Sequence, residues 1–112
     1  MNELHTFLQR LSGGDHLFAD TLAFVAEHYD YQPSGFDNAG LVSGRGQNEG
    51  SCKTLGLAQL EHFSKEETLL AFGEHYRSVL ATPEGSDHGN IRALMANDVA
   101  SVVFERAPLS PK

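Results

Sequence analysis

The single cysteine of the chain, Cys52, follows a glycine-rich run over residues 44–50. Ser51 is a suitable N-cap, so Cys52 is expected in the first turn of a helix that reaches about residue 62. There the positive end of the helix dipole and the neighbouring Lys53 would lower the pKa of the thiol and favour the thiolate. The position therefore predicts a candidate catalytic nucleophile.

A thiolate nucleophile needs a base, and the base needs a polar group to orient it. His88 is the best candidate because it lies in the turn sequence Asp87-His88-Gly89-Asn90 and not on an apolar face. Asp87 or Asn90 would orient the imidazole. This set predicts a cysteine-dependent hydrolase or transferase. The alternative is a buried, inert Cys52 that packs as a small hydrophobic residue.

Phosphate binding is a second interpretation of the glycine-rich run, because such loops present free N–H groups at the start of a helix. The spacing, GxGxxxG, matches neither the GxGxxG dinucleotide fingerprint nor the Gly-Lys-Ser/Thr ending of a P-loop. Glu49 and the formal net charge of −7 also disfavour an anion. We therefore expect no phosphate site in this run, and no motif in the chain predicts a cofactor.

Six histidines could suggest a metal centre, but none of them shows HxxxH spacing, and one cysteine cannot form CxxC. No local ligand pair is preorganised, so no metal site is predicted. Other polar residues in irregular segments are expected to cap helices and bond turns or, if they converge near Cys52, to line a small-molecule pocket. The candidates for such a binding site are Asn38, Asn48, Ser51, Asn90, Arg77 and Arg92.

The elements that would position these residues can be predicted from apolar spacing. Residues 4–11 and 18–29 both place apolar side chains at i, i+3, i+4 and i+7, which predicts an antiparallel pair of helices around the Gly13-Gly14 turn. Residues 30–50 contain five glycines and no helical periodicity. They are expected to form a long irregular segment with short extended pieces.

The second half of the chain has the clearest local signal, the capping box Ser64-Lys65-Glu66-Glu67. The helix that it starts keeps an apolar face to residue 80, and Gly73 on that face is expected to allow close approach of another backbone. A short helix over residues 91–95 and a strand over 99–104 follow. We therefore predict a helix-dominated α+β fold, with about five helices, a small β-sheet, a single domain over residues 1–106 and a flexible C-terminal tail over 107–112.

Composition excludes several classes of partner. Eight Lys and Arg residues are scattered along the chain and are outnumbered by fifteen Asp and Glu residues. Nucleic acid and anionic membrane surfaces would repel such a protein. No apolar run approaches the roughly 20 residues of a membrane span, and no signal peptide is expected. One cysteine cannot form an internal disulfide, which is typical of a reducing compartment.

Four ordered blocks of residues resemble the HopJ family of type III effector proteins. The blocks are Tyr29-Asp30-Tyr31 with Pro33, Phe36 and Asn38; Asn48 with Gly50-Ser51-Cys52-Lys53; Glu67-Thr68-Leu69 with Phe72-Gly73 and Tyr76-Arg77; and Pro83, Gly85, Asp87-His88, Asn90-Ile91-Arg92 and Met95. The likeness covers roughly residues 29–95. His75 stands where the family is typically tyrosine-like, so the resemblance gives it no role.

The resemblance implies a small bacterial α+β domain that acts by binding a protein or a small ligand, and it assigns no catalytic residues. Its partner would be a host protein, a bacterial protein or a small ligand. Its place of action would be the bacterial cytoplasm or, after type III secretion, a host cell. The cysteine-dependent enzyme remains the alternative function.

Overall fold

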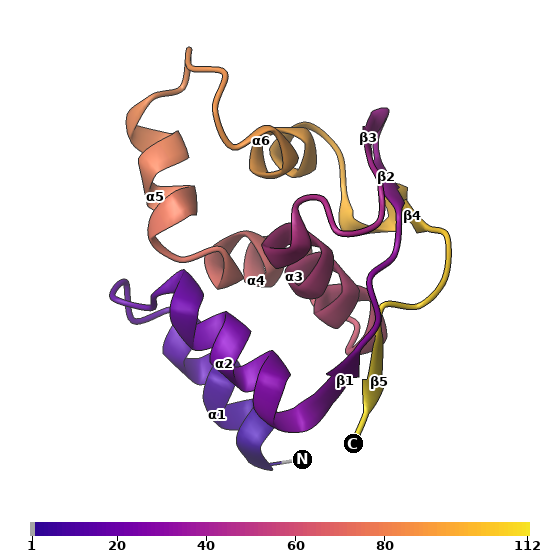
Figure 1. Cartoon of the computed structure of the whole chain (residues 1–112). Coiled ribbons are helices and arrows are strands. Elements are labelled where there is room, and N and C mark those ends of the chain that lie inside the picture. The colour runs from indigo at the N-terminus through magenta and orange to yellow at the C-terminus, as the bar shows by residue number, and fades with distance from the viewer. Residues whose placement is uncertain (1) are drawn as a thin grey trace.

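The computed structural model describes residues 2–112, which contain six α-helices and five three-residue strands (Figure 1). The helices are α1 (Asn2–Leu11), α2 (Phe18–His28), α3 (Glu49–Leu60), α4 (Lys65–Ala71), α5 (Glu74–Ala81) and α6 (Gly89–Ala96). The strands are β1 (Tyr29–Tyr31), β2 (Phe36–Asn38), β3 (Leu41–Ser43), β4 (Val102–Phe104) and β5 (Leu109–Pro111), and a 3₁₀ turn, Val99–Ser101, precedes β4. The fold is α+β, as predicted.

The N-terminal helices α1 and α2 lie next to each other at one end of the molecule (Figure 1). Their apolar faces meet through aromatic rings, because Phe7 of α1 stacks on Phe24 of α2 with the ring centroids 4.5 Å apart. Phe7 also packs on Phe63, which follows α3. The pair is thereby fixed to the central part of the fold.

Helix α3 is the centre of the core. Leu55, Leu57 and Ala58 are completely buried, because α2, α4 and β5 surround the helix. Burial on several sides explains why its sequence lacks a clear apolar stripe. The start of this buried helix is consequently held in a fixed position, which matters for the site below.

The single helix predicted after the capping box is in fact two, and this accounts for the sixth helix. Ser64 and Glu67 form the predicted box, with each side chain accepting a hydrogen bond from the other residue's backbone N–H. Gly73 then adopts φ of 61° and separates α4 from α5. A Cβ atom there would lie 2.5 Å from the backbone nitrogen of Phe18. The predicted close backbone approach is therefore confirmed, and it is made at the helix break.

The strands form two small antiparallel sheets, one with the order β3-β2-β4 and the other pairing β1 with β5. Residues 107–112, expected as a flexible tail, instead contribute β5. Leu109 of this strand is only 4% exposed. Pro108 and Pro111 do not prevent this pairing, because prolines are compatible with an edge strand.

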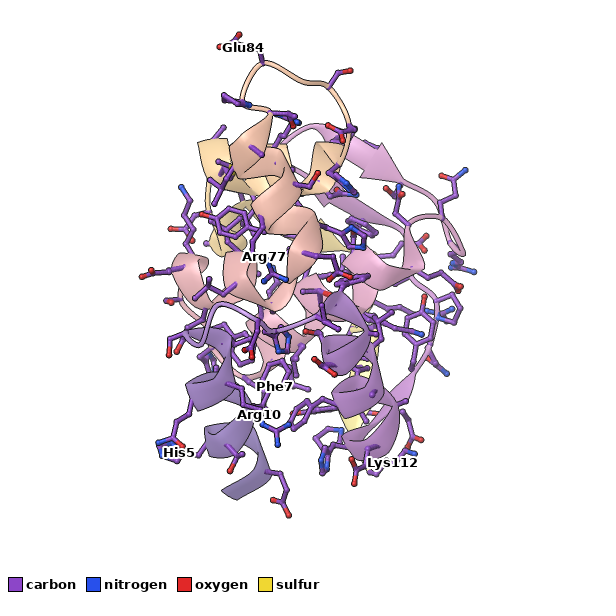
Figure 2. All side chains as sticks on the ribbon, turned by 90° about the vertical axis from the view of Figure 1, so that its left-hand side faces the viewer. His5, Phe7, Arg10, Arg77, Glu84 and Lys112 are labelled. Atoms are coloured by element: carbon purple, nitrogen blue, oxygen red, sulfur yellow. The ribbon has the colours of Figure 1, made fainter. Side chains whose placement is uncertain are left out.

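The two chain ends lie at the same end of the molecule. Figure 2 shows Lys112 at the foot of the molecule, where its side chain donates a hydrogen bond to the carbonyl of Ala26 in α2. Glu84, in the loop between α5 and α6, marks the opposite end. Among residues 2–112, no helix has the length and apolar character needed to cross a membrane.

Candidate functional site

A cavity of about 360 Å³ lies where the starts of α3 and α6 face the end of α4 and the beginning of α2. We call it the α3–α6 cavity. Four residues predicted to form a binding or catalytic site line it: Asn48, Ser51, His88 and Asn90. The other lining residues are Phe18, Gly50, Phe72, His75, Gly89 and Ile91.

The first turn of α3 presents unpaired backbone donors to this cavity. Asn48, the N-cap, has a left-handed conformation and makes no side-chain cap bond. Its amide instead donates to the hydroxyl of Ser43 at 2.9 Å. The first backbone bond of the helix runs from the N–H of Cys52 to the carbonyl of Asn48, so the N–H groups of Gly50 and Ser51 have no hydrogen-bond partner in the described chain.

The first turn of α6 has the same arrangement. Its N-cap, His88, is also left-handed and forms no side-chain cap. The first backbone bond is donated by Ile91 to the carbonyl of His88. The N–H groups of Gly89 and Asn90 are left without partners in residues 2–112. Two helix N-termini, both uncapped, therefore meet at one cavity.

The side chain of Asn90 adds a further free donor. Asn90 is 6% exposed, and its Oδ1 atom accepts a hydrogen bond from the amide nitrogen of Asn38 at 3.1 Å. The same Asn38 nitrogen donates to the backbone carbonyl of Asn90 at 2.9 Å. The bond to Oδ1 orients the Asn90 side-chain amide, and the bond to the carbonyl holds its backbone. Its Nδ2 group forms no hydrogen bond within the described chain and is left for the cavity that Asn90 lines.

Aromatic rings and imidazoles form the other wall. Phe18 stacks on Phe72 with 5.7 Å between the ring centroids, and His75 meets Phe18 edge-on at 5.0 Å. The rings of His75 and His88 are 4.9 Å apart. A Cβ atom on Gly50 would lie 2.8 Å from the Phe18 ring, so this glycine is what lets the aromatic wall reach the start of α3.

Three carboxylates near these elements are each engaged in a hydrogen bond or ion pair, and one of them, Asp87, pairs with Arg92 at 2.7 Å. Glu49, in the first turn of α3, accepts a hydrogen bond from the hydroxyl of Tyr31. Glu74, in the first turn of α5, accepts one from the backbone N–H of Phe18 at 2.6 Å, and that bond lowers the pKa of Glu74. The lining contains no Asp, Glu, Lys or Arg side chain. The electrostatics of the cavity are therefore set by helix ends, amides and imidazoles.

Cys52 does not belong to this cavity. Its side chain is 1% exposed, and its sulfur lies 3.6 Å from the backbone carbonyl oxygen of Ser34. Burial raises the pKa of the thiol, which outweighs the opposing effects of Ser34 and Tyr31. An exposed thiolate was the condition for the predicted Cys52–His88 chemistry. The structure contradicts that prediction and supports the alternative of a buried, inert cysteine.

Comparison with known proteins places the chain in a family. The family model described as HopJ type III effector protein matches residues 4–109. The chain belongs to this family. Its structure resembles the crystal structure of VPA0580, a protein of unknown function, with a TM-score of 0.90 and 36% sequence identity over 97% of this chain and 93% of that one. The search of curated proteins found no match.

The remaining predicted site residues of this HopJ domain stabilise the surrounding structure. Asp87 pairs with Arg92 at 2.7 Å, and this hydrogen bond lowers the pKa of Asp87. The nearest Asp87 oxygen lies 3.8 Å from Nε2 of His88, too far to orient the ring by a hydrogen bond. Arg77, labelled in Figure 2, extends from α5 and donates to the backbone carbonyl of His16 at 2.9 Å. Neither arginine lines the cavity.

Sequence reasoning missed the aromatic wall of Phe18, Phe72 and His75. Phe18 and Phe72 were expected on the apolar faces of regular helices, and His75 was given no role. The break at Gly73 moves Phe72 to the end of α4 and His75 to the start of α5, so both turn toward Phe18. The available signal was Gly73 itself. The described part of the chain shows no cluster of three or more His, Cys, Asp or Glu residues suited to a metal ion.

Proposed function

We propose that this HopJ domain is a binding module for a small anionic ligand, held in the α3–α6 cavity. The observation that carries the proposal is the convergence of two uncapped helix N-termini on one cavity, beside the fixed amide of Asn90. The α3–α6 cavity therefore presents hydrogen-bond donors that have no acceptor within the described chain.

An anion is the ligand that satisfies such a site. Each helix N-terminus carries roughly half a positive charge, so the two together are equivalent to about one unit charge. Backbone N–H groups at helix starts bind phosphate and carboxylate groups throughout proteins. The N–H groups of Gly50, Ser51, Gly89 and Asn90 would supply these bonds. The Ser51 hydroxyl and the Asn90 amide add two side-chain donors.

Binding without chemistry fits the family and the site together. The thiol that would have acted as nucleophile is enclosed, and His88 has no close partner to orient it as a base. A cavity of about 360 Å³ lies within the ~300–1,000 Å³ typical of small-molecule sites. The domain would act by sequestering or sensing its ligand.

The test is an amide-resolved NMR titration of the whole chain with inorganic phosphate and, separately, with acetate. Either anion is expected to shift the amide signals of Gly50, Ser51, Gly89 and Asn90 in a saturable way. Sodium chloride at matched ionic strength is the control for unspecific salt effects. If neither anion shifts these signals, or if the shifts are spread over the surface, the proposed function is wrong.

An isosteric variant makes the test sharper. Asn90→Asp keeps an oxygen to accept the bond from Asn38 but replaces the free amide with a negative charge. We expect at least a tenfold loss of anion affinity. Asn97→Asp introduces the same charge at the exposed end of α6, where Asn97 bonds the carbonyl of Ala93, and is expected to change affinity less than threefold.

The family assignment supports a proposal about the place of action. We propose that the domain is delivered by type III secretion and binds its ligand, or a host protein that carries it, inside the host cell; the bacterial cytoplasm is the alternative site. A translocation reporter fused to the chain would be compared in secretion-competent and secretion-deficient bacteria. A host-cell signal from the competent strain alone supports delivery, and equal signals contradict it.

A further inference from the structure

We infer that the ligand of the α3–α6 cavity is an aryl phosphate monoester, in which a phosphate dianion is linked to an aromatic ring. This inference rests on the proposed function and specifies its ligand. It is argued from the donor groups, from the size of the cavity and from the composition of its second wall.

The number of donors indicates phosphate over carboxylate. Unpaired donors at the cavity are the N–H groups of Gly50, Ser51, Gly89 and Asn90, to which the Asn90 amide and the Ser51 hydroxyl are added. A carboxylate has two oxygens and about four lone-pair positions. A phosphate monoester has three terminal oxygens and a charge of about −1.5 to −2 at neutral pH. It can therefore use more of these donors.

The charge of the site leads to the same conclusion. Two helix N-termini, equivalent together to about one positive charge, face the cavity, and His75 and His88 line it with them. Each imidazole carries a ring nitrogen that can donate a hydrogen bond. A dianion is the ligand that makes most use of this positive potential and of these donors. The nearby carboxylates are all engaged: Tyr31 donates to Glu49, the N–H of Phe18 donates to Glu74, and Arg92 pairs with Asp87.

The second wall indicates what the phosphate is attached to. A cavity of about 360 Å³ is in the size range of small-molecule sites and has room for a group attached to the phosphate. Phe18, Phe72 and Ile91 line it; Phe72 and Ile91 are buried, so the partly buried ring of Phe18 is the aromatic surface left for that group. Aromatic rings pair favourably in stacked or edge-on contacts, as Phe18 already does with Phe72 and His75. An aryl group fits this wall.

Two sources can supply this chemistry: a free small molecule, and a phosphotyrosine side chain of a protein. Phenyl phosphate represents the chemistry that they share. A short phosphotyrosine peptide with blocked ends represents the second source. Equal or tighter binding of the peptide would identify a phosphoprotein as the source, and binding of phenyl phosphate alone would identify a small molecule.

The experiment is a calorimetric titration of the whole chain with phenyl phosphate, ethyl phosphate, benzoate and inorganic phosphate. Phenyl phosphate is expected to bind at least tenfold more tightly than each of the other three. If benzoate binds as tightly as phenyl phosphate or more tightly, the phosphate assignment is wrong, although the proposal of anion binding stands. If ethyl phosphate binds as tightly as phenyl phosphate, the aryl assignment is wrong. No binding of any anion would overturn the proposed function itself.

A variant of the aromatic wall separates the two parts of the ligand. Phe18→Leu keeps an apolar side chain of similar size but removes the ring. It is expected to lower the affinity for phenyl phosphate at least fivefold and to change the affinity for ethyl phosphate less than twofold. Phe24→Leu, in the same helix but away from the cavity, is the matched control and should change neither affinity. An equal effect of Phe18→Leu on both esters would contradict stacking at this wall.

Discussion

Asn38 shows how one buried side chain determines the chemistry of its neighbour. It is completely buried, and its amide nitrogen donates twice to Asn90. Its own oxygen has no hydrogen-bond partner in the described chain, which is a costly arrangement. The cost is consistent with a role in orientation, because the bond to Oδ1 of Asn90 holds that oxygen and leaves the Asn90 amide nitrogen for the cavity. At the residue scale, the site depends on amides and not on the cysteine that the sequence emphasised.

Cys52 gives the first prediction at this scale. Cys52→Ala is expected to lower the free energy of unfolding by about 1–2 kcal/mol, because it removes a buried atom from a packed core. Anion affinity should stay unchanged, since Cys52 does not line the cavity. Chemical denaturation and the phosphate titration measure the two effects. A loss of anion binding without a loss of stability would show that Cys52 acts in the site.

The native thiol is also expected to resist labelling. Its burial and raised pKa predict slow reaction with a disulfide reagent at pH 7, followed by complete reaction in denaturant. Rapid labelling of the folded chain would contradict the enclosed position of Cys52.

His16 predicts a dependence of stability on pH. The hydroxyl of Thr21 donates to the carbonyl of Ala71, so it accepts its bond from Nε2–H of His16, 2.7 Å away. Burial is the main cause that lowers the pKa of His16 below its ordinary value of 6.5. The unfolded chain therefore takes up the proton first as the pH falls. The contribution of neutral His16 to the free energy of unfolding is complete above about pH 6.5. It is lost as the pH decreases through the pKa of His16 in the folded state.

The measurement is the free energy of unfolding between pH 5 and 8 for the native chain and two variants. His16→Gln does not ionise in this range and is expected to show a smaller loss of stability toward pH 5. His5→Gln, at an exposed histidine of α1, should retain the native dependence. If the free energy of unfolding depends on pH in the same way for the native chain and for His16→Gln, groups other than His16 cause the pH dependence.

At the scale of elements, local signals were predictable and breaks enforced by tertiary contacts were not. The capping box at Ser64 is a local pattern of hydrogen bonds, and it formed as expected. The apolar face from residue 69 to 80 indicated one helix, because the spacing of apolar residues does not reveal a change in the direction of the helix axis. That change is imposed by the backbone of α2 against Gly73. The same limit hid the aromatic wall.

The candidate site was predictable in its residues but not in its assembly. Asn48, Ser51, His88 and Asn90 stood out as polar residues in irregular segments, and the structure brings them to one cavity. His88 was assigned to Cys52 chemistry because the sequence cannot show that the helix turns the thiol inward. Phosphate binding was rejected on the spacing of one loop, on Glu49 and on the net charge of −7. The two helix starts that replace such a loop are about 40 residues apart in sequence.

Gly73 supplies the prediction at this scale. Gly73→Ala is expected to destabilise the fold by at least about 3 kcal/mol, because a Cβ would collide with the Phe18 backbone and φ is positive. Gly14→Ala is the control. Gly14 also has a positive φ, of 84°, but no atom lies within 4 Å of the position of its Cβ. It should cost about 1 kcal/mol. Equal losses of stability in Gly73→Ala and Gly14→Ala would show that backbone strain alone, and not the contact with α2, requires a glycine at the break between α4 and α5.

At the scale of the whole molecule, the two ends of the chain close the fold around α3. Strand β5 pairs with β1, and β1 directly continues α2. Pro108 and Leu109 lie against Gly56 of α3. Figure 1 shows β1 and β5 side by side beneath the larger sheet. The C-terminal segment thus holds α2, and with it Phe18, against the central helix, whose first turn is half of the proposed anion site.

Leu109→Ala tests this closure. It removes most of a side chain that is 4% exposed, and we expect a loss of about 2–5 kcal/mol in the free energy of unfolding. Each kcal/mol should lower Tm by roughly 4–8 °C in a domain of this size. Ser110→Ala, at an exposed neighbouring position of the same strand, should stay within about 0.5 kcal/mol of the native chain. Thermal and urea unfolding would measure both variants, and an unaffected Leu109→Ala would mean that the C-terminal strand does not stabilise the domain.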